Sequence, residues 1–226
     1  MRLFGLLTIA LLLLASAFPL AVEDLAAEDL AAEDLGSQVT SKRTLTPEER
    51  AEKEARKACK IEICDIIATK EANGPNVSCD IGWSWRAEEI FEALGGRIDW
   101  NWGKAVCETE LRLERAALAK AMSISRASIK VGAHTVRCAL HDEGKPHKIE
   151  IELAPRIAFK NGKATEAGVN WGDVSAPAAI YPLLYAATGL DNSTNLLGPE
   201  VVRQVNKFVR KDCARVKDEL PGRRVN

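Results

Sequence analysis

Residues 59–67 read Cys-Lys-Ile-Glu-Ile-Cys-Asp-Ile-Ile and form the centre of a predicted helix. Cys59, Ile63, Ile66 and Ile67 recur at the spacing of an α-helix, so they are expected to form one buried stripe. The helix also carries two of the six cysteines in the chain. The partners of these two cysteines therefore determine which other segments are bonded to the helix.

Both ends of this helix are marked in the sequence. Thr46 can cap its start, Pro47 suits its first position, and Glu49 completes a capping box. We expect the helix to run to about Lys70, because Asn-Gly-Pro at 73–75 ends it. The folded domain is therefore predicted to begin at residue 46.

The start of the chain has the pattern of a secretory signal peptide. Arg2 supplies the positive charge, residues 3–14 are apolar, and Ala-Ser-Ala at 15–17 forms a cleavage site. No later stretch is long and apolar enough to span a bilayer. We therefore predict a soluble secreted or periplasmic protein whose cysteines form disulfide bonds.

The sequence constrains the cysteine pairing without fixing it. Cys59 and Cys64 are five residues apart, so on a helix they lie about 140° apart around the axis, which is poor geometry for a mutual bond. Each is expected to pair elsewhere. Of the possible connectivities, the expected one is Cys64–Cys79, Cys107–Cys138 and Cys59–Cys213.

An acidic repeat follows the predicted signal peptide. Residues 21–35 are three copies of a pentapeptide that ends in Glu-Asp-Leu. Five residues turn a helix by about 500°, so the leucines share no face, and we interpret the repeat as a spacer. The predicted organisation is a signal peptide at 1–17, a low-complexity acidic repeat and linker at 18–45, and a single globular α+β domain at 46–226.

The middle of the chain alternates between apolar and polar residues, which predicts β-strands. Asn161-Gly162 predicts a type I′ hairpin that Trp171 closes. Helices are expected again at 176–188, kinked by Pro182, and from Gly198 onward. The predicted fold is an α+β, disulfide-stapled antiparallel β-meander with N- and C-terminal helices packed on it. The alternating segments lie around 81–85, 98–102, 107–113, 134–140 and 149–153.

Five tryptophans fall in this middle region. Four of them form two pairs, 83 with 85 and 100 with 102, and the spacing of two residues places both indoles of a pair on one face of a strand. They could stack on sugar rings or line an apolar pocket, but the favoured interpretation is that they form the core beneath the helices, because large aromatics dominate core burial. The candidate ligand-binding residues are Trp83, Trp85, Trp100, Trp102 and Trp171.

Motifs for catalysis or cofactor binding do not occur in the sequence. His141 and His147 flank a predicted turn, so a metal there is conceivable, although they lack a recognised ligand spacing and exposed turn histidines are the common case. There is no hydrolase elbow, Walker loop or dinucleotide fingerprint, so no catalytic residue and no cofactor is assigned. The charge balance does not favour nucleic acid as a partner.

Two short segments and four cysteines of the chain resemble a group of exported proteins. The run Ile-Cys-Asp-Ile-Ile at 63–67 with Cys79, followed by Trp-Asn-Trp-Gly at 100–103 with Cys107, Cys138 and Cys213, resembles small exported proteins of Gram-negative bacteria that lack an assigned activity. It covers roughly residues 58–215. The resemblance implies a periplasmic or secreted location and carries over no catalytic residue.

Two classes of function fit these observations. The first is a non-catalytic domain that binds a protein, a glycan or a small apolar ligand. The alternative is a periplasmic hydrolase or metal-dependent enzyme whose active site is assembled from distant positions. A purely structural envelope protein is a third possibility.

Overall fold

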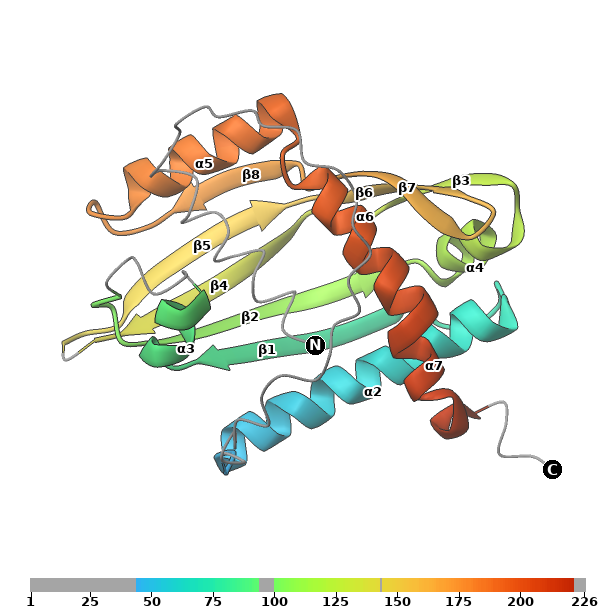
Figure 1. The fold of residues 1–226 in the computed structure, drawn as a ribbon, viewed down its shortest axis with the longest axis horizontal. Helices are drawn as coiled ribbons and strands as arrows, with labels where there is room; N and C mark the ends of the chain where they lie inside the picture. Colours follow the sequence, from blue (N-terminus) through green and yellow to red (C-terminus); the bar gives the residue numbers. More distant parts are fainter. Residues whose placement is uncertain (1–43, 94–99, 143, 222–226) are drawn as a thin grey trace, which may run out of the picture.

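The computed structural model describes residues 44–93, 100–142 and 144–221 (Figure 1). The predicted signal peptide, the acidic repeat and Ile98 lie outside these residues. Within the described part of the chain, no helix is long and apolar enough to cross a membrane.

Two antiparallel sheets and a set of surrounding helices make up an α+β fold, as predicted. The larger sheet has the order β1-β2-β4-β5-β8, and its strands are Val77–Trp85, Lys104–Leu113, His134–His141, His147–Leu153 and Trp171–Ser175. The smaller sheet has the order β3-β6-β7, with strands Arg126–Lys130, Arg156–Lys160 and Lys163–Gly168. The helices are α2 Pro47–Thr69, α3 Ala87–Ala93, α4 Arg115–Ser123, α5 Tyr181–Thr194, α6 Gly198–Lys207 and α7 Cys213–Arg215, with a π-helical turn at Phe208–Asp212 and a 3₁₀ turn at Lys217–Glu219.

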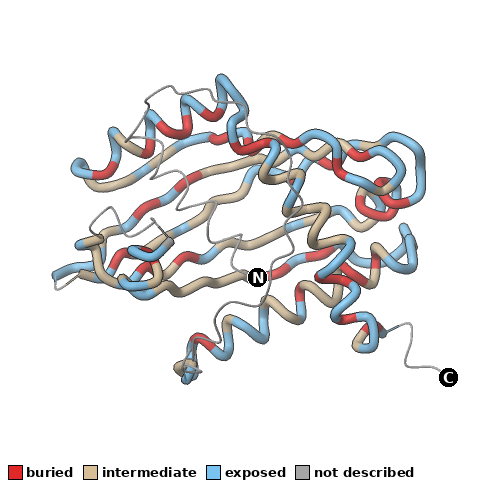
Figure 2. Tube along the Cα trace, viewed as in Figure 1, coloured by how far each residue is buried: buried red, intermediate tan, exposed pale blue. Residues whose placement is uncertain are grey.

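The larger sheet is apolar on one face only. Along β5, for example, Ile149 and Ile151 are buried while Lys148 and Glu150 are exposed. Because successive side chains of a strand point to opposite faces, this alternation gives one core face and one solvated face. Figure 2 shows buried residues on the helices where they meet the sheets and each other.

Helices border both edges of the larger sheet. α2 lies along β1 and α5 lies along β8, and the C-terminal helices run from β7 to α2 (Figure 1). The Arg56 side chain of α2 donates to the carbonyl of Gly82, and the Ser84 hydroxyl donates to Glu52 at 2.5 Å. These contacts occupy the free edge of β1, which would otherwise expose unpaired backbone groups.

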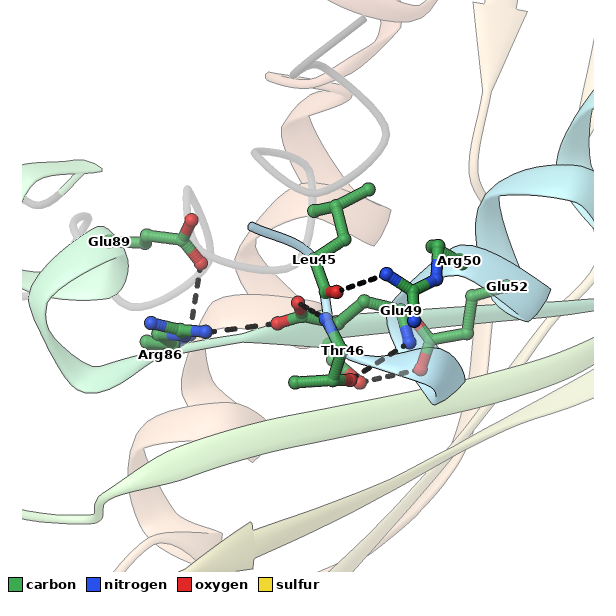
Figure 3. Close-up of polar contacts among 8 residues, drawn as sticks. Leu45, Thr46, Glu49, Arg50, Glu52, Arg86 and Glu89 are labelled. Carbon is green, nitrogen blue, oxygen red and sulfur yellow. Dashed lines mark hydrogen bonds and ion pairs between the residues drawn. The ribbon is translucent and has the colours of Figure 1, made fainter. Parts of the chain in front are cut away.

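The start of α2 is the capping box that the sequence predicts. The Glu49 backbone N–H donates to the Thr46 hydroxyl at 3.2 Å, and the Thr46 N–H donates to the Glu49 carboxylate at 2.9 Å. Figure 3 shows the buried Glu49 also facing the guanidinium of Arg86, 3.8 Å away. The capping box thereby joins the first turn of α2 to the segment that follows β1.

Two of the three predicted disulfide bonds differ from those in the structure. Cys107–Cys138 is confirmed, with Cα atoms 4.0 Å apart. The predictions Cys64–Cys79 and Cys59–Cys213 are wrong, because Cys59 bonds Cys79 (Cα–Cα 5.8 Å) and Cys64 bonds Cys213 (5.2 Å). The two α2 cysteines do point in different directions, as expected, but it is Cys59 that faces β1 and Cys64 that faces the C-terminal helices.

Several element boundaries also differ from the prediction. Trp100 and Trp102 precede β2, which begins at Lys104, instead of forming a strand. Asn161 and Gly162 do form the hairpin turn, with φ of 51° and 74°. Its second strand ends at Gly168, so Trp171 starts a strand of the other sheet.

The helix predicted at 176–188 is α5, which begins only at Tyr181. Pro182 therefore lies in its first turn, where its missing N–H leaves no hydrogen bond unmade, so the predicted kink does not occur.

Replacing Thr46 with alanine is expected to lower the free energy of unfolding by about 1 kcal/mol, because the Glu49 N–H loses its acceptor. Urea denaturation measures the change. Thr44→Ala, two residues upstream and outside the capping box, is the matched control and should leave stability within about 0.5 kcal/mol of the parent. Equal stability of the two variants would contradict this account of how α2 begins.

Candidate functional site

An apolar cavity of about 140 Å³ lies on the core face of the larger sheet. Three strands supply its floor, with Ala105 and Cys107 from β2, Cys138 and Leu140 from β4, and Ile149 and Ile151 from β5. Its walls are Trp85, Ile90, Trp100, Trp102, Ala179, Ile180, Leu183 and Leu184. We call this cavity the tryptophan pocket.

The strand register explains why these floor residues meet. Cys107 lies opposite Cys138, and Ala105 lies opposite Leu140. Directly opposite residues share a face of the sheet, so both pairs point into the same space. Ala105 is the smallest of these side chains, and its position opposite Leu140 leaves part of the cavity open.

A tight turn holds two of the tryptophans in place. The Trp100 indole N–H donates to the Gly103 carbonyl at 2.7 Å. Gly103 has φ of 66°, and a Cβ atom there would lie 1.9 Å from the His141 carbonyl oxygen. Only glycine fits such a close approach, so the chain can bring Trp100 and Trp102 over the sheet.

Trp102 is supported by a polar pair at the β4–β5 turn. Its ring meets the His147 ring edge-on, with centroids 5.5 Å apart. His147 Nε2 lies 2.9 Å from the Asp142 carboxylate. The Gly144 backbone N–H and then His147 lower the pKa of Asp142, so this carboxylate is ionised at neutral pH and accepts the Nε2–H hydrogen bond. The pair therefore orients the imidazole against Trp102.

A buried carboxylate fixes the helix that forms the opposite wall. Asp191, 3% exposed, accepts from the Trp171 indole N–H at 2.8 Å and from the Leu197 backbone N–H at 2.7 Å. Asn192 adds hydrogen bonds to both the N–H and the carbonyl of Trp171. These contacts hold α5 on β8 and so position Ile180 and Leu184 over the floor.

The five predicted tryptophans divide into three groups. Trp85, Trp100 and Trp102 line the tryptophan pocket. Trp171, 7% exposed, is a core residue beneath α5. Trp83 stacks on Trp85, with centroids 6.5 Å apart, and lies 5.8 Å below the Arg56 guanidinium, on the side toward α2. Three of the five tryptophans therefore line an apolar pocket, and Trp171 belongs to the core, so each interpretation of the sequence applies to different residues.

The two candidate metal ligands are not brought together. His147 lies opposite Leu140 and faces the core side with Trp102, whereas His141 is the next residue of β4 and is exposed on the other face. Among the described residues, no group of three or more histidine, cysteine, aspartate or glutamate side chains could hold a metal ion.

The sequence analysis missed the helical half of the pocket. Ile90 on α3 and Ile180, Leu183 and Leu184 at the start of α5 line it, yet none was a candidate. The available signal was the cluster of apolar residues around Pro182, which the prediction treated as the middle of a helix.

A second, polar cavity of about 190 Å³ lies between β6, β7 and the C-terminal end of α5. Its three asparagines are already used by the backbone. Asn170 donates to the Ala154 carbonyl and Asn195 to the Ala167 carbonyl, both at 2.9 Å, and Asn192 bonds the N–H and the carbonyl of Trp171. Asn170 and Asn195 also have positive φ, which suits their place in turns. We therefore assign these groups a structural role.

Comparison of the chain with protein-family models, with curated proteins and with solved structures gives no match. The resemblance to exported bacterial proteins consequently stays a prediction.

Replacing Asp191 with alanine is expected to lower the free energy of unfolding by at least about 2 kcal/mol, because two buried N–H groups lose their acceptor and each costs about 1–3 kcal/mol. Urea denaturation followed by tryptophan fluorescence measures the change. The control is Asp173→Ala on β8, whose exposed side chain should change stability by less than about 0.5 kcal/mol. A similarly small effect of Asp191→Ala would show that the carboxylate does not hold α5.

Proposed function

We propose that this protein is a non-catalytic binding domain that takes up a compact apolar group in the tryptophan pocket. The observation that carries the proposal is the pocket itself, an apolar cavity of about 140 Å³ bounded by Trp85, Trp100 and Trp102. A cavity of roughly 150 Å³ with an apolar lining can hold one benzene molecule. The group bound is therefore about the size of one aromatic ring or one branched aliphatic side chain.

The lining favours an apolar ligand over a sugar. Hydroxyl groups buried without hydrogen bonds cost free energy, and the pocket offers them few partners. Its lining is hydrocarbon, indole and one disulfide, and the Trp100 N–H is already donated to Gly103. Of the ligand classes that the sequence leaves open, a small apolar molecule or an apolar side chain of a protein fits this surface best.

Binding is also favoured over hydrolysis. General acid–base and nucleophilic catalysis need a titratable or nucleophilic side chain within reach of the substrate. Among the described residues that line the pocket, none carries such a group, since both of its cysteines are joined in a disulfide.

We further propose that the protein is exported. The predicted signal peptide motivates this location, and three disulfides in the described residues support it, because disulfides persist in oxidising compartments.

The expected affinity for a simple hydrocarbon is low. Burial of a group the size of a leucine or phenylalanine side chain contributes about 1.5–3 kcal/mol. That corresponds to a Kd in the millimolar range or weaker, so a physiological ligand needs further contacts around the pocket.

Toluene is the probe for this proposal. We expect saturable shifts of the methyl NMR signals of Ile149, Ile151 and Leu184, which line the pocket. Ala105→Leu adds three carbon atoms to the floor and should abolish these shifts. Trp102→Ala removes part of the wall and should weaken binding several-fold.

The matched control is Ala139→Leu, the same substitution on the next strand. Ala139 is the neighbour of Leu140 and so points to the solvated face, where a leucine leaves the pocket unchanged. Toluene binding that survives Ala105→Leu, or that Ala139→Leu abolishes equally, would place the site elsewhere and overturn the proposal.

A further inference from the structure

The Cys107–Cys138 disulfide is part of the floor of the tryptophan pocket. We propose that this bond is a redox site, which small thiols without further charged groups reach through the pocket and open while the other two disulfides stay closed. The inference rests on the pocket of the proposed function but not on the identity of its ligand.

The three disulfides differ in their surroundings. Cys138 is half-buried, whereas the other five cysteines are buried. Cys59–Cys79 lies in the core between α2, β1 and α4, among Ile66, Val77 and Leu118. Cys64–Cys213 is covered by Val216 and Leu220. An external thiolate must touch a sulfur atom, and it can do so most directly at Cys138.

The reaction is thiol–disulfide exchange. A thiolate attacks Sγ of Cys138, the Cys107–Cys138 bond breaks, and Cys107 leaves as a thiolate that takes up a proton. A second thiolate attacks the sulfur of the first reagent molecule in the mixed disulfide, which releases Cys138 as a thiol. Overall the protein disulfide gains two electrons and two protons, and two thiols become one small-molecule disulfide.

The fold holds the two thiols in place after the bond opens. Cys107 and Cys138 are opposite residues of an antiparallel ladder, and Val106–Ala139 and Glu108–Arg137 pair on either side of them. The other two disulfides still tie α2 to β1 and to the C-terminal helices. Opening is therefore local and reversible, and it changes the floor of the pocket without unfolding the domain.

The pocket also sets which thiols can react. Its volume of about 140 Å³ and its apolar lining admit 2-mercaptoethanol, whereas glutathione is a larger tripeptide that carries carboxylates. Both reagents attack as thiolates, but glutathione would also bring its carboxylates into apolar surroundings, which is unfavourable, so it should react more slowly.

The test exposes the native protein, without denaturant, to 2-mercaptoethanol. Samples are quenched in acid, alkylated and mapped by mass spectrometry. We expect Cys107 and Cys138 to be alkylated at least tenfold faster than the other four cysteines. If another pair opens first, or all three open together, the proposal is overturned.

A second arm tests the route through the pocket. Ala105→Leu should slow the opening of Cys107–Cys138 at least fivefold and Ala139→Leu should not, and an unchanged rate in Ala105→Leu would overturn the route. Should Ala105→Leu fail to fold, a comparison of two thiols on the parent protein decides.

The rate at which each thiol opens Cys107–Cys138 is divided by its rate with a small model disulfide. The normalised rate of glutathione should be at least tenfold lower than that of 2-mercaptoethanol, and equal normalised rates would overturn the proposal. Neither arm uses toluene, so failure here is distinct from failure of the proposed function.

Discussion

The register between β2 and β4 is the constraint on which the other features of this structure depend. It places Cys107 opposite Cys138 and Ala105 opposite Leu140, all on the core face. A slip of one residue would turn every side chain of one strand to the solvated face, because side chains alternate with a period of two. Burial of one face already disfavours that slip and the disulfide opposes it further, and the floor of the tryptophan pocket follows from the same register.

Polar contacts then fix what lies at each edge of the sheet. At β1, Arg56 bonds the Gly82 carbonyl, and at β8, Asp191 bonds the indole of Trp171. In both places a side chain from a helix satisfies a hydrogen-bonding group of an edge strand. Side chains of the described residues cover the apolar core face between these two edges, and the tryptophan pocket is the part of that face that they leave open.

The proposed activities both derive from this one region. An apolar cavity over a disulfide brings a binding surface and a reactive bond together, with Cys138 common to both. A ligand in the pocket would cover the sulfur atoms, and the reduced thiols would present a different floor to the ligand. Occupancy and redox state would therefore be coupled through direct contact.

Local sequence determined the features that depend on neighbouring residues alone. The capping box at Thr46 and Glu49, the turn at Asn161 and Gly162, and the one-sided strands follow from hydrogen-bonding groups and alternation within a few residues. The pairing of Cys107 with Cys138 was also predicted, because both stood on expected neighbouring strands.

Only the tertiary structure decided which faces of the helices and strands pack against one another. Cys59 and Cys64 point apart on any helix, but only the packing of α2 against β1 and α7 assigns Cys79 to one and Cys213 to the other. In the same way, Trp171 is a core residue because α5 packs over it, and Trp102 is a pocket wall because the turn at Gly103 and the ring of His147 hold it over the sheet. These outcomes depend on contacts between segments far apart in the chain, and such contacts leave no periodic signal in the sequence.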